Sequence, residues 1–338
     1  MKTIGVLSTG LVTSVGLSAP AACAAIRAGL TNPTETHFID SSGERIQAHQ
    51  VPLSAPWLGR IKLVKMATMA IAESLADVPR QDWQRIPLLL CVAEHERPGR
   101  LKGLDDEVLF EIEQELNVQF AEQSRVIPQG RISIGIALMH AQQLVAQEGV
   151  PFVLIAATDS LIAWPTLSVY ESGNRLLTPA NSNGFMPGEG ASALLVGEPP
   201  TETSLWCTGL GFATESAHID SGEPLRAEGL SQAIKGALGD AGCEMHDLDL
   251  RITDLSGEHY YFKEAALALS RTLRRRKEEF DLWHPAECIG EAGAVAGLAM
   301  IAVAHAACHR RYARANNLLW HAGNDSGERA AGVLQFRA

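Results

Sequence analysis

Short apolar runs alternate with helix-period stretches along most of this chain, and this alternation restricts the folds that it can adopt. Runs of this length, bounded by turn residues, are typical of strands buried between helices. The strand candidates are "TIGVLSTG", "IPLLLCVAE", "PFVLIAATDS", "ASALLVGE", "LWCTGLGFA", "LDLRITDLS", "NNLLWHAG" and "AAGVLQFR". The helix candidates are 21–29, 64–75, 105–116, 134–147, 227–241, 261–280 and 292–312. The sequence therefore predicts a layered α/β fold.

A weak internal repeat divides the chain into two related halves. "PFVLIAATDS" followed by "GASALLVGE" is similar to "NNLLWHAGND" followed by "AAGVLQFR". In each pair a buried strand ends in a polar turn, a second strand follows, and a helix rich in small residues comes before them. The polar, Pro-containing segment "GEPPTETS" separates the copies. We expect an N-terminal half over 1–200 and a C-terminal half over 201–338.

The composition excludes several classes of protein. The net charge is −11, whereas nucleic-acid binding needs a basic face, so no nucleic-acid partner is expected. The basic run "RTLRRRK" is followed at once by acidic residues and is interpreted as a solvated helix face. The charged segment "ERPGRLKGLDDEV" is interpreted either as a surface loop or as a partner-binding element.

The six cysteines and the apolar segments indicate a cytoplasmic protein. None of the cysteines is paired at CxxC spacing, which fits a reducing compartment. The first residues, "MKTIGVLSTG", lack the features of a signal peptide, and the apolar stretch 292–307 is short for a membrane span. The histidines in "GEHYY" and "CHRRY" lack spaced partners, so neither a metal nor another cofactor is expected.

Four segments in order resemble the β-ketoacyl synthases of the thiolase superfamily. They are "TGLVTSVGLSAPAACAAIRAGLTN", "NSNGFMPGEGASALLVGE", "AEGLSQAIKGALGDAGCEMHDLDL" and "IGEAGAVAGLAM". The resemblance covers most of the chain and is thin between about residues 35 and 125 and after 312. It implies a five-layer α-β-α-β-α fold of two related halves, which dimerises through the edge of the first-half sheet.

The resemblance also implies a cysteine nucleophile at the start of the helix before "PFVLIAATDS", but no cysteine is present there. The segment reads "VIPQGRISIGIALMHAQQL", and the expected position falls near Ile132, with Arg131 and Ser133 beside it. An isoleucine cannot attack a thioester. Ser133 could do so after a one-residue shift, although a hydroxyl needs an adjacent base. Cys91, inside an apolar strand, is interpreted as a core residue.

The two family histidines are also replaced. In "DLSGEHYYFKE", Gly257 matches the family glycine, which places Ser256 where the first histidine would be. Glu291 occupies the place of the second histidine, in "IGEAG", and Ala286 that of the family lysine. A carboxylate beside a forming enolate has the wrong charge. Malonyl condensation by the usual mechanism is therefore not expected, and Glu291 is also compatible with capping a helix dipole.

A different active site is a second hypothesis. Ser256, Glu258, His259 and Glu291 could approach one another and form a Ser-His-carboxylate set for acyl transfer or hydrolysis. Such an acyl-thioester transferase or hydrolase would use Ser133 or Ser256 as the nucleophile. However, "SGE" recurs in this chain in turn-like contexts, where Ser-Gly is ordinary turn chemistry.

The leading hypothesis is a non-catalytic, synthase-like partner subunit or adaptor. "HPAECIGEAGA" together with "DLSGEHY" is most similar to the β-ketoacyl-synthase-like proteins found beside effector genes of bacterial type VI secretion systems. That resemblance implies a role in loading or stabilising a secreted effector. A chain-length-factor-like subunit of a fatty acid or polyketide synthase is the alternative. The expected partners are a second copy, a related synthase-like protein, an effector or an acyl carrier protein.

Overall fold

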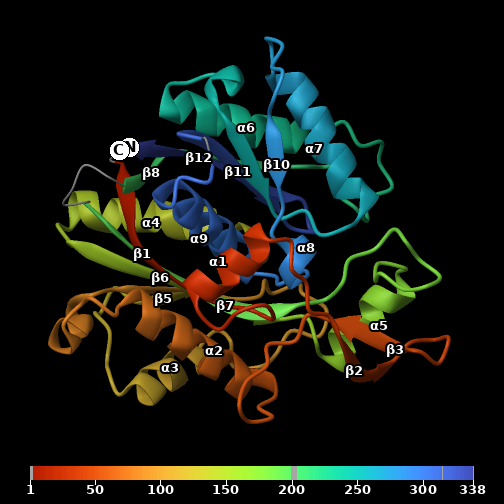
Figure 1. The fold of residues 1–338 in the computed structure, drawn as a ribbon, viewed down its shortest axis with the longest axis horizontal. Helices are drawn as coiled ribbons and strands as arrows, with labels where there is room; N and C mark the ends of the chain where they lie inside the picture. The colour runs from red at the N-terminus through yellow and green to blue at the C-terminus, as the bar shows by residue number, and fades with distance from the viewer. Residues whose placement is uncertain (1–2, 199–203, 314, 338) are drawn as a thin grey trace.

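A 10-stranded sheet forms the centre of the molecule in this computed structural model, which describes residues 3–198, 204–313 and 315–337 (Figure 1). From one edge to the other, the strands are β10 (Asp281–Trp283), β9 (Leu250–Thr253), β11 (Asn317–Gly323), β12 (Glu328–Arg337), β8 (Ser204–Thr214), β1 (Ile4–Val12), β7 (Glu189–Gly197), β6 (Phe152–Ser160), β4 (Leu88–Cys91) and β5 (Arg125–Ile127). A separate hairpin joins β2 (Thr34–Ile39) to β3 (Arg45–Ala48). Every predicted strand lies in the sheet, and the predicted α/β class is confirmed.

The order of the strands repeats on the two sides of the β1–β8 junction. Outward from β1, the pairings with β7, β6, β4 and β5 are antiparallel, antiparallel, parallel and parallel. Outward from β8, the pairings with β12, β11, β9 and β10 follow the same sequence. The boundary predicted between residues 200 and 201 lies outside the described residues, so the division into 1–200 and 201–338 stays a prediction.

Helices and sheet form five layers (Figure 1). One outer layer holds α2 (Gly59–Ser74) and α3 (Val108–Leu116), and the opposite one holds α6 (Glu228–Ala241) and α7 (His259–Thr272). Between the two parts of the sheet lie α1 (Ala19–Arg27), α4 (Ser133–Gln147) and α9 (Val295–His309). The short helix α5 (Trp164–Ser172) lies to one side, near the β2–β3 hairpin, and α8 (Ala286–Ile289) lies next to α1 and contributes Cys288 and Ile289 to the main core (Figure 1). This is the predicted α-β-α-β-α arrangement.

Helix α9 is apolar around most of its circumference because it is buried between the two parts of the sheet. In α9, the segment "VAGLAMIAVAHAACH" is almost wholly buried, as expected for a helix without a solvent face. A side chain at Gly297 would meet Ile134 of α4, so the two helices approach closely at this glycine. No helix in the described part of the chain is both long enough and apolar enough to cross a membrane.

The structure corrects one predicted helix and adds several elements that were not predicted, namely the β2–β3 hairpin, β5, β10, α5 and α8. The helix predicted over 261–280 ends at Thr272, and Lys277 in the following segment donates a hydrogen bond to the His246 carbonyl at 3.0 Å. This tertiary contact replaces the helical path, although the segment contains neither Gly nor Pro. The β2–β3 hairpin and α5 carried no clear periodic signal in the sequence.

Candidate functional site

Acidic side chains follow the carboxyl ends of the four inner parallel strands of the sheet. Asp159 is at the end of β6, Glu94 follows β4, Asp254 follows β9, and Asp325 follows β11. The carboxyl ends of parallel strands are where α/β folds usually bind ligands. These residues belong to what we call the buried ionic cluster, which comprises Glu94, Arg97, Arg131, Asp159, Arg175, Asp254, Glu258, Tyr261, Glu291 and Asp325.

Arg131 occupies the centre of this cluster. It lies in the 3-10 turn Gly130–Ile132 that leads into α4, and its backbone N–H donates to Asn324 Oδ1 at 3.1 Å. Its guanidinium donates to Asp325 Oδ1 at 2.6 Å, to Tyr261 Oη at 2.8 Å and to Glu291 Oε2 at 3.3 Å. Asp254 Oδ2 lies 3.9 Å from its Nε. The N–H groups of this buried cation are thus directed at protein acceptors.

Two further arginines extend the cluster. Arg175 donates to both oxygens of Glu258, at 2.7 and 2.8 Å, and to Asp325 Oδ2 at 2.6 Å. Arg97 donates to both oxygens of Glu94, at 2.8 Å each, and its Nη1 lies 3.4 Å from Asp159 Oδ2. Bidentate arginine–carboxylate pairs hold both planar groups in a fixed geometry.

The cluster contains more carboxylates than cations, and this excess divides the acids into two groups. Burial raises the pKa of Asp254 to about 6, and burial also raises the pKa of Asp159 and of Glu258. Burial acts in the same direction on Asp325, but Arg131 and Arg175 hold the pKa of that carboxyl well below its usual range. The cluster therefore combines a firmly ionised carboxylate, Asp325, with others that protonate more readily.

Almost no space remains between these side chains. The hollow lined by the cluster has a volume of about 10 Å³, which is the size needed for a single water molecule. An acyl chain or a pantetheine arm would have to displace the buried ion pairs. The space within the cluster is therefore filled, whereas a neighbouring hollow of about 280 Å³, lined by Glu94, Arg175 and Asp325 among others, is open.

Two of the predicted site residues, Ile132 and Ser133, point away from the cluster. Ile132 is buried in the main apolar core. The Ser133 hydroxyl donates to the Ile127 carbonyl at 3.2 Å and accepts the Gln129 N–H at 3.3 Å. Of the residues around the expected nucleophile position, Arg131 is the one that reaches the cluster.

The other predicted residues are also separated. Glu291 lies in the cluster and accepts the Gly293 N–H at 3.0 Å, so it also stabilises the turn that precedes α9. The Ser256 hydroxyl is buried with no hydrogen-bond partner among the described residues, while His259 is exposed. The structure thus brings Glu258 and Glu291 to the same hollow but does not join Ser256 to His259.

Most of the cluster was missed by sequence reasoning. The repeat contained a usable signal, since the polar turns in "IAATDS" and "HAGND" supply Asp159 and Asp325 from corresponding strands. The charged segment "ERPGRLKGLDDEV" gave a misleading one, because its Arg97 is buried and its Arg100 is paired with Asp105 at 2.6 Å.

Comparisons with known proteins support the fold. No family model matches the chain. A putative polyketide β-ketoacyl synthase 2 from Streptomyces cyaneus is 30% identical over 184 residues, which cover 49% of this chain and 43% of that protein, so the match spans less than half of the relative. The structure of the ishigamide ketosynthase/chain length factor matches with a TM-score of 0.79 and 16% identity over 100% of both chains.

A second solved structure gives the same result. It is the type II polyketide synthase complex AntDE:AntF, an acyl-carrier protein with its ketosynthase bound to the hexaketide, and it matches with a TM-score of 0.79 and 13% identity over 99% of both chains. At these identities the likeness concerns the fold alone. The chain has the thiolase-like fold of β-ketoacyl synthases.

Proposed function

We propose that this chain is a non-catalytic subunit with the β-ketoacyl synthase fold and that it acts by binding a partner. The observation that carries the proposal is Arg131, which stands beside the expected nucleophile position and is bonded to Asp325, Glu291 and Tyr261. A permanently charged guanidinium cannot act as a nucleophile. Its partners also fill the space between the side chains of the cluster.

The electrostatics of the cluster argue in the same direction. A condensing enzyme stabilises a developing enolate with cations or hydrogen-bond donors. Here Glu291 and Asp254 face the same centre, and the cations present are already engaged by carboxylates. Burial also raises the pKa of the Cys91 thiol, so this strand cysteine is a poor source of thiolate.

The sequence-based alternative, an acyl-thioester transferase or hydrolase, has weaker support. Ser133 is fully buried and its hydroxyl is engaged with backbone groups of the preceding turn. Ser256 has no base within hydrogen-bond distance among the described residues. Either serine would have to move before it could be activated.

The proposed partner is a second synthase-fold chain, either a copy of this one or a relative. Support comes from the ketosynthase/chain length factor and acyl-carrier-protein complexes that share the fold. Strand β5, at the edge of the sheet, pairs only with β4 and leaves its other side available for the dimer contact that we propose there. Adaptor action for a type VI secretion effector remains a more specific prediction, carried by the sequence motifs.

The first experiment separates a partner subunit from an enzyme. The purified protein is incubated with malonyl-CoA and with octanoyl-CoA, and the intact mass and the release of CO₂ are followed, with an active ketosynthase as the positive control. We expect neither an acyl adduct nor decarboxylation. An adduct on Ser133 or Ser256 that disappears in the corresponding Ser→Ala variant would contradict the proposal.

The second experiment identifies the partner. The tagged protein is captured from its native host and co-purified proteins are identified by mass spectrometry. An active synthase with an acyl carrier protein would support a chain-length-factor-like role, whereas a toxin-like effector or another degenerate synthase would support the adaptor role. Purification as a monomer with no stoichiometric partner would argue against both.

A further inference from the structure

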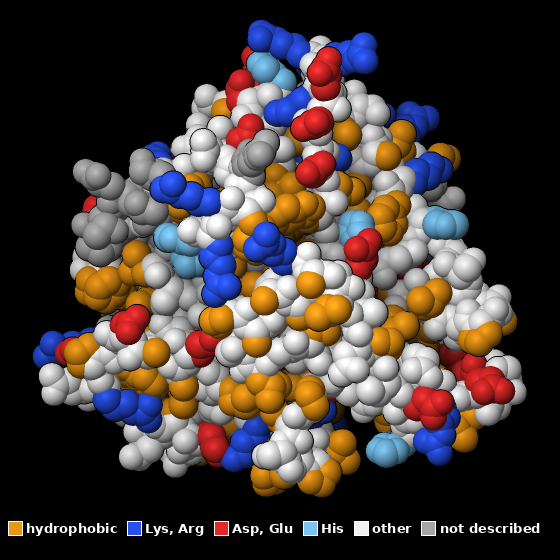
Figure 2. All heavy atoms as spheres, viewed as in Figure 1, with side chains coloured by type: hydrophobic (Ala, Val, Ile, Leu, Met, Phe, Trp, Pro, Cys, Tyr) orange, Lys and Arg blue, Asp and Glu red, His pale blue; other side chains and the backbone are white. Residues whose placement is uncertain are grey.

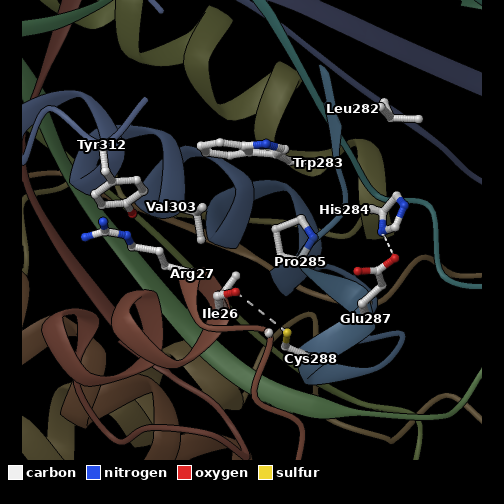
Figure 3. Close-up of a pocket in the computed structure, with 11 residues that line it drawn as sticks. Ile26, Arg27, Leu282, Trp283, His284, Pro285, Glu287, Cys288, Val303 and Tyr312 are labelled. Atoms are coloured by element: carbon white, nitrogen blue, oxygen red, sulfur yellow. Dashed lines mark hydrogen bonds and ion pairs between the residues drawn. The ribbon is translucent and has the colours of Figure 1, made fainter. Parts of the chain in front are cut away.

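A hollow of the described structure lies away from the buried ionic cluster. It is formed by the end of α1, strand β10, helix α8 and the second half of α9, and it has a volume of about 460 Å³ (Figure 3). No residue lines both this hollow and the small hollow of the cluster. Pockets of 300 Å³ or more are of the size that small-molecule ligands occupy. We call it the α1–α8 pocket.

Part of the wall of the α1–α8 pocket is apolar and aromatic, and the remainder is polar. Ile26, Pro285 and Val303 provide aliphatic surface (Figure 3). The rings of Trp283 and Tyr312 are nearly parallel, with an interplanar angle of 22° and centroids 6.4 Å apart. Two nearly parallel rings beside aliphatic groups favour a flat apolar guest, because aromatic faces gain most from stacking.

The two ends of the pocket differ in charge. At one end, the Arg27 guanidinium lies over the Tyr312 ring at 4.3 Å, and no carboxylate in the described part of the chain lies within ion-pair distance of it. At the other end, Glu287 lies 2.9 Å from His284 Nδ1, a contact that neutralises the carboxylate only when the histidine is protonated (Figure 3). The pocket therefore has a cation at one end, over the Tyr312 ring, and a carboxylate at the other.

A second arginine strengthens the positive end. Burial raises the pKa of Tyr312 to about 12, and the fields of Arg27 and Arg310 act against that rise. Both cations are thus close enough to influence the same phenol. In Figure 2, hydrophobic side chains on this face are flanked on one side by Lys or Arg side chains and on the other by His and acidic ones.

We propose that the α1–α8 pocket binds a small molecule with a flat, apolar body and one anionic group, such as an aryl carboxylate or sulfonate. The body lies against Trp283, Pro285 and Val303, and the anion pairs with Arg27. Arg27 is suited to this role because a guanidinium presents several donors to a planar anion. The site is independent of the partner-subunit function proposed above.

The test uses two fluorescent probes that differ in charge. These are 8-anilinonaphthalene-1-sulfonate and its uncharged analogue N-phenyl-1-naphthylamine, each titrated into the full chain. We expect saturable binding of the sulfonate at one site, with a weaker affinity for the uncharged analogue. Arg27→Ala should weaken sulfonate binding by about tenfold, the usual loss for one charge-assisted contact, and leave binding of the analogue unchanged.

A matched arginine serves as the control. Arg337 is exposed and lies 4.8 Å over the ring of Trp206, in a geometry like that of Arg27 but outside the pocket, so Arg337→Ala should leave both affinities unchanged. Trp283→Leu keeps an apolar side chain but removes the ring, and it should weaken binding of both probes by about threefold to tenfold. Circular dichroism and thermal melting verify that each variant folds.

Three outcomes would overturn the proposal. The first is no saturable sulfonate binding to the wild type. The second is equal affinity for both probes, which would leave no role for the anion. The third is unchanged sulfonate affinity in a folded Arg27→Ala variant, which would place the probe elsewhere on the molecule.

Discussion

The buried ionic cluster and the α1–α8 pocket are two polar regions that the same fold treats in opposite ways. The cluster lies at the carboxyl ends of the inner strands, where its own side chains leave a hollow of about 10 Å³. The α1–α8 pocket lies at the end of helix α1 beside an edge strand, and it leaves about 460 Å³ empty. The space between the side chains of the cluster is thus filled, whereas the α1–α8 pocket is open.

The comparison shows that this fold accommodates a densely packed set of buried charges at the carboxyl ends of its inner strands. Charges buried without partners would destabilise the core, but each arginine of the cluster faces at least two carboxylates. Such networks contribute little net stability over an apolar core, yet removal of one member is costly because the others remain buried. Substitutions in the cluster are therefore expected to change the free energy of unfolding strongly, and substitutions in the pocket only slightly.

We expect the largest loss of stability when Arg131, the central cation of the cluster, is replaced. Arg131→Met should lower the free energy of unfolding by about 3–5 kcal/mol, because Asp325, Glu291 and Asp254 would lose their shared partner in the core. Urea denaturation measures the change. The control is Arg226→Met, an exposed arginine just before α6, with an expected change below about 0.5 kcal/mol.

A double variant sharpens this prediction. Asp325→Asn in the Arg131→Met background removes a carboxylate together with its cation, so part of the loss should be recovered. Additive effects of the two substitutions would contradict the network, since they would mean that the two side chains do not interact.

The next largest effect is expected at a glycine that supports the cluster. Gly293 has φ +56, and a side chain there would meet the carboxylate of Asp159. Gly293→Ala should therefore cost about 3 kcal/mol, of which backbone strain accounts for about 1–2 kcal/mol. Gly149 has φ +67 with open space around it. Gly149→Ala should therefore lose only the stability that corresponds to backbone strain, without a steric clash. Equal changes in melting temperature for the two variants would show that Gly293 has room for a methyl group.

We expect the ionisation of Asp254 to make the stability of the protein depend on pH, with a change of intermediate size. Its pKa is raised to about 6 in the folded state, so between about pH 4 and pH 6 the folded protein holds a proton that the unfolded chain has released. The stability of the wild type therefore falls, through this group, as the pH rises across that window. Asp254→Asn removes the dependence, and its stability relative to the wild type should increase by about 2 kcal/mol between pH 4 and pH 7.5.

For Asp325 in the same cluster, we expect the contribution to stability to change with pH in the opposite direction. Arg131 and Arg175 hold its pKa below the ordinary value, so its contribution to stability is present above pH 4 and is lost as the pH falls further. Asp325→Asn should consequently be destabilising at pH 7.5. Denaturation curves of both variants at pH 4, 6 and 7.5 test the two signs together, and a rise in stability for Asp325→Asn at pH 7.5 would contradict the assignment.

The fold could be predicted from the sequence because its signals are local. Buried strands such as β6 and β7 are continuous apolar runs, and α9 is a long run of small and apolar residues. The end of α7 could not be predicted in this way. No residue in "RTLRRRKEEF" is a helix breaker. The helix nevertheless ends at Thr272, and Lys277 in the following segment donates hydrogen bonds to the carbonyls of His246 and Leu248.

The candidate site was less predictable because its partners are distant in the chain. Glu291 was located through a conspicuous Gly-rich motif. Arg131 was named only as a neighbour of the expected position, since periodicity leaves the start of a helix uncertain by a residue or two. The burial of Arg97 depends on Asp159, which is 62 positions away in the sequence and leaves no mark in the composition of the loop.

The smallest effect on stability is expected at Arg27 in the α1–α8 pocket. This exposed side chain lies over Tyr312 without a carboxylate partner in the described chain, and exposed cation–π contacts are worth at most about 1 kcal/mol. Arg27→Ala should therefore change the free energy of unfolding by less than about 1 kcal/mol, although the same variant should lose about tenfold in affinity for the anionic probe. Arg131→Met provides the reverse case, with a large loss of stability and no direct contact with the pocket. A loss of 3 kcal/mol or more in Arg27→Ala would mean that Arg27 holds α1 and α9 together, and the pocket would then be a by-product of that contact instead of a site kept open for a ligand.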